Sequence, residues 1–147
     1  MRRREFLTAS LATSAAALAG NTQAVAENAR EFYQIRRYAL ISGPQLKLTE
    51  TYLSGALIPA LGRMGMGHIG AFKVDIGPET PTYYVVIPAT KAAALAELDL
   101  HLAQDEEFLK AAEPFWSAPA TAPAFQRVEY SLLAAFEGLS AVGLTLP

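Results

Sequence analysis

The stretch that decides the fold reads FYQIRRYALISGP and occupies residues 32–44. Its first part is rich in aromatic and β-branched side chains, which favour a strand over residues 32–41. Ser42 and Gly43 then interrupt the strand, and Pro44 suits the first turn of a helix that Ser42 would cap. The pattern therefore predicts a strand that turns directly into a helix.

The segment that follows is expected to form a long helix that ends at Gly65 and Gly67. An apolar stripe at helical spacing runs along it, formed by Leu46, Leu53, Leu57, Ala60, Leu61 and Met64. Pro59 falls within this helix, and its ring presses on the carbonyl of Gly55, four residues earlier. A kink is therefore expected near Pro59.

The remaining chain contains two more strand-like stretches, a helical region and a final strand. The strands expected at residues 68–76 and 82–87 flank a short turn rich in Gly and Pro, which predicts a hairpin. Thr90 is expected to cap the next helix, and Asp105 to begin another. The last strand is expected over residues 125–136.

The resulting order is βαββαβ with one additional helix. This is the ferredoxin-like pattern, an α+β fold in which helices cover one face of a four-stranded antiparallel sheet. The strand over residues 82–87 is apolar on both faces, so the uncovered face of the sheet also requires a partner. Association of two sheets would bury that face, so we expect a homodimer.

Composition limits the class of protein. The chain has 147 residues, of which 52% are hydrophobic, and this is enough for one domain with a substantial core. Its net charge of -2 argues against nucleic acid as a partner. Cysteine is absent, which excludes disulfides and thiolate metal sites.

The first 26 residues have the layout of a signal peptide. Arg3 and Arg4 stand shortly before Phe6 and Leu7, an arrangement that resembles the twin-arginine signature. The weakly apolar run that continues to Ala19 is too short to cross a bilayer. The resemblance implies that the export machinery carries the protein out of the cytoplasm already folded.

A small-x-small motif at Ala24 and Ala26 marks the expected cleavage site. Cleavage there would leave residues 27–147 as the mature domain, with its core at residues 32–136, in the periplasm or outside the cell. No later apolar run reaches the length of a membrane span, so no membrane is expected as a partner of this domain. The alternative is that the basic start forms an amphipathic anchor.

The first strand also carries a family resemblance. Residues 32–40, followed by Gly43, look like the opening of NIPSNAP domains, which read Tyr-Glu-Leu-Arg-x-Tyr-x-Leu with a glycine before the first helix. Gly77 is similar to a glycine that ends the second strand in this family. Asp105 and Phe108 resemble its Asp-Pro-x-Trp motif.

The resemblance extends over residues 32–136 and implies a dimeric α+β barrel, in which two ferredoxin-like sheets pack face to face. The wider superfamily includes small oxygenases, isomerases, dehydratases and haem-handling enzymes. For the NIPSNAP branch itself the resemblance implies no general reaction.

Arg36 and Tyr38 are the strongest candidates for chemistry. They stand two residues apart on a strand and therefore share one face. Arg36 could bind a carboxylate or stabilise developing negative charge, and Tyr38 could donate a proton or a hydrogen bond. The structural alternative is an ion pair between Arg36 and Glu129 on the last strand.

His68, at the start of the second expected strand, is a third catalytic candidate, as a general base or an axial haem ligand; the alternative is a solvated strand end. Tyr84 and Tyr130 are candidates for an aromatic-ligand pocket, or for sheet core with polar tips. His68 and His101 lack the spacing of a metal site, and no dinucleotide or phosphate-binding fingerprint occurs, so no cofactor is expected.

The sequence therefore predicts an exported, dimeric NIPSNAP-like domain that binds a small apolar or aromatic molecule in a cavity between sheet and helices. One alternative is a cofactor-independent oxygenase or isomerase that uses Arg36, Tyr38 and His68. The other is a purely structural or protein-interaction module. The sequence leaves open whether the protein is an enzyme.

Overall fold

The computed structural model describes residues 30–41 and 43–136. In chain order the elements are β1 (Phe32–Ala39), α1 (Gly43–Tyr52), the π-helix η1 (Leu53–Leu57), α2 (Ile58–Arg63), β2 (Gly70–Lys73), β3 (Thr82–Ala89), α3 (Ala92–Ala96), α4 (Leu98–Leu102), α5 (Glu106–Trp116) and β4 (Arg127–Ala134). Within these residues no helix is both long and apolar enough to cross a membrane. The expected signal segment at residues 1–26 and the expected cap Ser42 lie outside the described residues.

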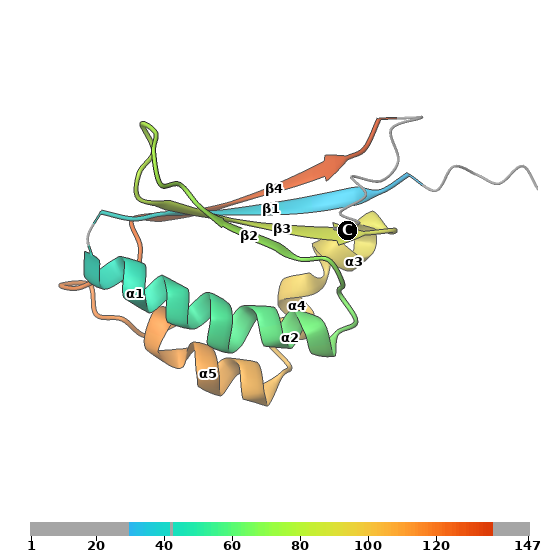
Figure 1. Ribbon diagram of the computed structural model, residues 1–147. Helices are drawn as coiled ribbons and strands as arrows, with labels where there is room; N and C mark the ends of the chain where they lie inside the picture. The colour runs from blue at the N-terminus through green and yellow to red at the C-terminus, as the bar shows by residue number, and fades with distance from the viewer. Residues whose placement is uncertain (1–29, 42, 137–147) are drawn as a thin grey trace, which may run out of the picture.

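The four strands form one antiparallel sheet in the order β2-β3-β1-β4. Figure 1 shows the described helices on one side of this sheet, with the long helix α1–η1–α2 next to it and α5 beneath that helix. This is the ferredoxin-like α+β arrangement, so the fold expected from the sequence is confirmed. The expected hairpin is confirmed as well, because β2 and β3 pair with each other.

Alternation along β1 separates the two faces of the sheet. Gln34, Arg36, Tyr38 and Leu40 are buried against the helices. The residues between them, including Arg37, are half-buried on the opposite face. Successive strand residues point to opposite faces, which is why a step of one residue moves a side chain from the core to the other side.

The long helix changes its winding in the middle. Leu53–Leu57 is π-helical, and the N–H of Ile58 donates to the carbonyl of Leu53, five residues earlier. Pro59 follows directly and has no N–H to donate to Gly55, so the α-helical ladder is interrupted at this point in any case. The disturbance expected at Pro59 thus takes the form of a π-helical segment just before it.

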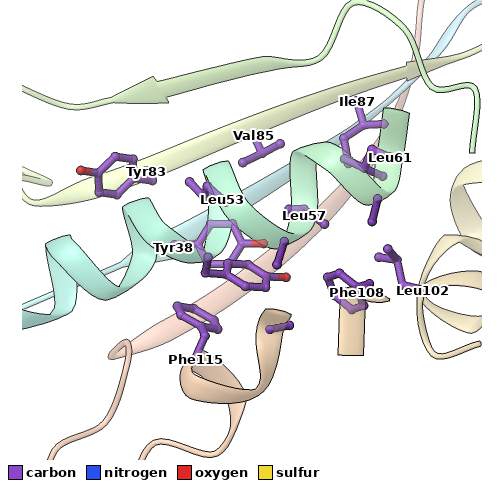
Figure 2. Close-up of a cluster of buried hydrophobic side chains, with 14 of the residues drawn as sticks. Tyr38, Leu53, Leu57, Leu61, Tyr83, Val85, Ile87, Leu102, Phe108 and Phe115 are labelled. Carbon is purple, nitrogen blue, oxygen red and sulfur yellow. The ribbon is translucent and has the colours of Figure 1, made fainter. Parts of the chain in front are cut away.

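The core lies between the sheet and the long helix and extends to α5 (Figure 2). Val85 of β3 and Leu57 and Leu61 of the long helix are fully buried in it. Tyr38 stands between the sheet and α5 and meets Phe115 edge-on, with 6.1 Å between ring centroids. The helix-covered face of the sheet is therefore one wall of the core.

Three local expectations can be compared with the structure. The helix α3 has no side-chain cap, so the expected role of Thr90 is wrong. The strand β2 is confined to Gly70–Lys73, and His68 precedes it with a φ of 58°, which a strand does not allow. The carboxylate of Asp105 accepts a hydrogen bond from the N–H of Phe108 at 2.9 Å, so the expected start of α5 is confirmed.

Candidate functional site

A cavity of about 540 Å³ opens between α4, α5 and the helix-covered face of the sheet. Arg36 on β1 and Tyr130 on β4 form its sheet wall, since the strand register places them opposite each other. Its other walls are formed by Tyr52, Asp99, Leu102, Ala103, Phe108, Leu109, Ala112, Glu113, Trp116 and Ser117. The cavity therefore combines largely apolar walls with a small polar group around Arg36.

Arg36 is the buried polar centre of this cavity, with 1% of its side chain exposed. Its Nε donates to Oε1 of Gln34 at 2.7 Å, and its Nη2 donates to Oδ1 of Asp99 at 2.8 Å. Its Nη1 lies 3.4 Å from the hydroxyl of Tyr130, whose ring centre lies 4.5 Å from the guanidinium carbon. The Nε2 of Gln34 donates in turn to the carbonyl of Leu95 at 3.1 Å. These contacts fix the guanidinium at the cavity wall.

The charge of Arg36 is only partly balanced. Burial acts to lower its pKa, but Tyr130, Tyr38 and Asp99 together raise the pKa above its ordinary value, so the guanidinium stays charged. The side chain of Asp99 is 53% exposed. Solvent screens such a carboxylate, so it balances a buried cation incompletely. Arg36 is therefore a source of positive potential inside the cavity.

The hydroxyls of Tyr38 and Tyr52 are buried without a hydrogen-bond partner among the described residues. Tyr52 lines the cavity, and Tyr38 meets its ring edge-on at 6.1 Å between centroids. Burial raises the pKa of Tyr38, and it raises the pKa of Tyr52 to about 12, so both phenols are neutral at physiological pH. A buried hydroxyl without a partner costs about 1–3 kcal/mol. Tyr52 therefore contributes a neutral hydroxyl that is buried at the cavity wall, close to Tyr38 and Trp116.

Aromatic rings build the wall next to these polar groups. Tyr52 stacks on Phe115, with ring centroids 4.1 Å apart and planes inclined by 11°. Trp116 meets both rings edge-on, at 5.8 Å from Tyr52 and 5.1 Å from Phe115, and remains 48% exposed. Of these three rings, Tyr52 and Trp116 line the cavity, and the half-exposed Trp116 offers aromatic surface to a flat ring that enters it.

The structure brings Arg36 and Tyr130 together at the cavity, with Tyr38 behind them. It does not bring His68 there, because His68 is exposed in the loop before β2 and does not line the cavity. Tyr84 points to the opposite face of the sheet and lines a separate hollow of about 640 Å³, which Tyr130 also borders. The sequence-predicted site residues are thus divided between the two faces and the loop.

The expected ion pair between Arg36 and Glu129 is wrong. Glu129 lies on the opposite face of the sheet, where its Oε2 is 2.5 Å from Nη1 of Arg37. Arg37 also lies 3.4 Å from Oε1 of Glu79. The step of one residue along β1 decides which arginine can reach Glu129, and Arg36 has Asp99 as its partner instead.

The sequence pattern does not single out Gln34, Tyr52, Asp99 and Trp116 as site residues. Gln34 could have been found, because it stands two residues before Arg36 on the same strand and shares its face. Tyr52 lies on the buried stripe of the long helix. Asp99 and Trp116 carry no such signal, because their positions depend on how α4 and α5 dock.

No family model and no curated protein matches this chain. Solved structures do match it. One is a NIPSNAP family protein from Agrobacterium tumefaciens str. C58, with a TM-score of 0.57 at 19% identity over 74% of this chain and 88% of that one. A NIPSNAP family protein of unknown function from the same organism has a TM-score of 0.52 at 22% identity, over 71% of this chain and 87% of that one. An uncharacterized NIPSNAP-like domain protein from Burkholderia xenovorans has a TM-score of 0.56 at 16% identity, over 74% of this chain and 87% of that one.

These structures define the structural class of the chain. Its fold is the α+β fold that these NIPSNAP proteins share. Because the identities are this low, the likeness shows the fold alone, and the function has to be argued from the site.

Proposed function

We propose that this chain is an exported, homodimeric NIPSNAP-like protein that binds a small apolar or aromatic molecule in the cavity beside Arg36. The observation that carries the proposal is the cavity itself, with its aromatic walls and one buried guanidinium held by Gln34, Asp99 and Tyr130. Its volume of about 540 Å³ falls within the range of about 300–1,000 Å³ that is usual for small-molecule sites. Such sites combine apolar walls with a few placed polar groups.

The second copy is proposed from the uncovered face of the sheet. Among the described residues no helix covers that face (Figure 1). It carries Phe72, which is 54% exposed, and Leu133, which is 41% exposed, with Ile35 and Val86 on the strands between them. Exposed apolar surface of this kind marks interaction sites. The same face of a second copy would bury these residues around a two-fold axis.

Export is proposed from the sequence. The twin-arginine-like start with Arg3 and Arg4 and the small-residue motif ending at Ala26 support it. The mature protein would then begin at Glu27 and function in the periplasm or outside the cell.

An enzymatic role has narrower support. Arg36 could stabilise negative charge, and Tyr38 is a neutral phenol whose hydroxyl has no partner among the described residues. A cofactor-independent oxygenase or isomerase at this cavity would depend mainly on Arg36, because neither Tyr38 nor His68 lines it. We therefore rank ligand binding ahead of catalysis.

The test is a native mass spectrum of the protein purified from its own host. We expect the mass of two chains that start at Glu27 plus a non-protein component. Ala103→Trp places an indole at the cavity wall and is expected to lose that component. The matched control, Ala111→Trp, adds the same bulk at an exposed position of α5 outside the cavity lining and is expected to keep it.

A bare dimer in all three proteins would contradict ligand binding and favour an interaction module. A monomer at micromolar concentration would contradict the second copy. A mature protein that retains residues 1–26 would contradict processing at Ala26.

A further inference from the structure

The charged groups of the cavity differ in burial: the guanidinium of Arg36 is buried, whereas the two carboxylates of the lining are exposed. Arg36 is buried and charged, and the hydroxyls of Tyr38 and Tyr52 have no partner among the described residues. The acidic side chains that line the cavity, Asp99 and Glu113, belong to residues exposed to solvent. The complement of such a cavity is a molecule that brings acceptor oxygens and negative charge.

We propose that the ligand is an anionic aromatic molecule whose acidic group replaces Asp99 on Arg36 and whose ring lies against Tyr52 and Trp116. This inference rests on the proposed function, because it names the class of molecule held in that cavity. It adds a direct competition between the ligand and a side chain of this chain.

Asp99 is suited to being displaced. It holds Arg36 through one oxygen, at 2.8 Å, and its side chain is half-exposed on the short helix α4. An exposed carboxylate that leaves such a pair is solvated at once, so the cost of its release lies in the unpaired Arg36, which the acidic group of the ligand pairs again. The guanidinium stays in place meanwhile, because Gln34 and Tyr130 continue to hold it.

An acidic ligand group would make contacts that Asp99 does not make. A carboxylate or sulfonate can accept two parallel hydrogen bonds from a guanidinium, whereas Asp99 accepts one from Arg36. A neutral aromatic molecule would gain only the ring contacts with Tyr52 and Trp116. The cavity therefore favours the anion.

The test uses two fluorescent probes that share one skeleton. 8-Anilinonaphthalene-1-sulfonate carries a sulfonate, and N-phenyl-1-naphthylamine lacks it. Both are titrated against the full chain and against Asp99→Asn, which removes the competing charge with almost no change in shape. We expect Asp99→Asn to tighten binding of the anionic probe by about fivefold and to change binding of the neutral probe by less than about twofold. Glu113→Gln is the matched control, because it removes another acidic group of the cavity wall and no ion-pair partner of Arg36.

Two results would overturn the inference and leave cavity binding intact. One is an equal change of both probes in Asp99→Asn, or no change in either. The other is an equal gain for the anionic probe in Glu113→Gln, which would reflect general electrostatics. If Ala103→Trp binds both probes as tightly as the native protein does, the probes do not occupy the cavity, and both the proposed function and this inference fail.

Discussion

Two neighbouring arginines on β1 have different surroundings on the two faces of the sheet. Arg36 faces the helices with 1% of its side chain exposed, and the carboxylate that it binds, Asp99, is itself half-exposed. Arg37 faces the other way, is 26% exposed and lies between Glu79 and Glu129. The buried charge of Arg36 is thus incompletely balanced beside a cavity. The half-buried charge of Arg37, on the opposite face, is paired with two carboxylates. Incomplete balance at a buried arginine is thus the feature that sets the proposed binding position at Arg36 apart from the ion pairs of Arg37.

The largest expected effect comes from placing a charge on either face of β3. Val85 is fully buried against the helices, and Val86 is half-buried on the other face. Val85→Asp buries an unpaired carboxylate, so we expect the free energy of unfolding to fall by about 3–5 kcal/mol, measured by urea denaturation followed with circular dichroism. Val86→Asp is expected to keep the fold and to convert the proposed dimer into a monomer in light scattering. An equal loss of structure in both variants would contradict the difference between the faces.

Alkaline pH is expected to act on the helix-covered face. Burial raises the pKa of Tyr52 from its ordinary value of 10.0 to about 12, because the fold favours the neutral phenol. The corresponding stability is complete below pH 10 and is lost as the pH rises through about 12, by about 2–3 kcal/mol. We expect Tyr52→Phe to remove this part of the decline, but not the part that Tyr38 contributes, in a series of urea midpoints between pH 9 and pH 12. An unchanged decline in Tyr52→Phe would assign the effect to other groups.

A smaller effect compares two hydroxyls on that same face at neutral pH. Tyr38→Phe removes a buried hydroxyl that has no partner among the described residues, so we expect stability to be unchanged or to rise by about 1 kcal/mol. Tyr83→Phe removes a hydroxyl that donates to the carboxylate of Glu50, so we expect a loss of about 1 kcal/mol. Chemical denaturation of the ligand-free protein measures both. A loss in Tyr38→Phe as large as that in Tyr83→Phe would mean that the Tyr38 hydroxyl has a partner.

The smallest effect belongs to the opposite face. The ion pair between Arg37 and Glu129 is partly exposed, with 26% and 36% of the side chains accessible. Arg37→Met is therefore expected to lower stability by less than about 1 kcal/mol, and 1 M salt should reduce the difference further. The anionic probe should bind this variant as it binds the native protein. A marked loss of probe binding would place part of the ligand site on this face.

Much of the fold could be predicted because it depends on periodic patterns. The aromatic and β-branched alternation of residues 32–41 marks a strand, and the acidic start at Asp105 marks a helix N-terminus. His68 could not be placed in this way. It lies among the glycines that end the long helix and takes a left-handed conformation, which no periodicity predicts.

The site could be predicted only where its residues share one strand. The sequence predicts Arg36 and Tyr38 together because a period of two relates them. Asp99 reaches Arg36 from 63 residues further along the chain, on a five-residue helix whose docking leaves no local pattern. Tyr84 and Tyr130 lie on opposite faces of the sheet because the register between the strands pairs Tyr84 with Arg37 and Tyr130 with Arg36. That register is not visible in the pattern of a single strand.

The π-helical segment keeps the two halves of the long helix in phase. Buried residues recur at every fourth position along it, at Gln45, Thr49, Leu53, Leu57 and Leu61. In an uninterrupted α-helix this spacing would drift by about 40° per step, so one end of the row would turn away from the sheet. The wider π turn takes up part of that drift, which makes the helix equivalent to two α-helices joined with an offset of one residue. If the same residues were wound as an uninterrupted α-helix, Tyr52 would therefore be rotated by about 100° relative to Leu61, the angle of one residue, and its hydroxyl would turn away from Arg36.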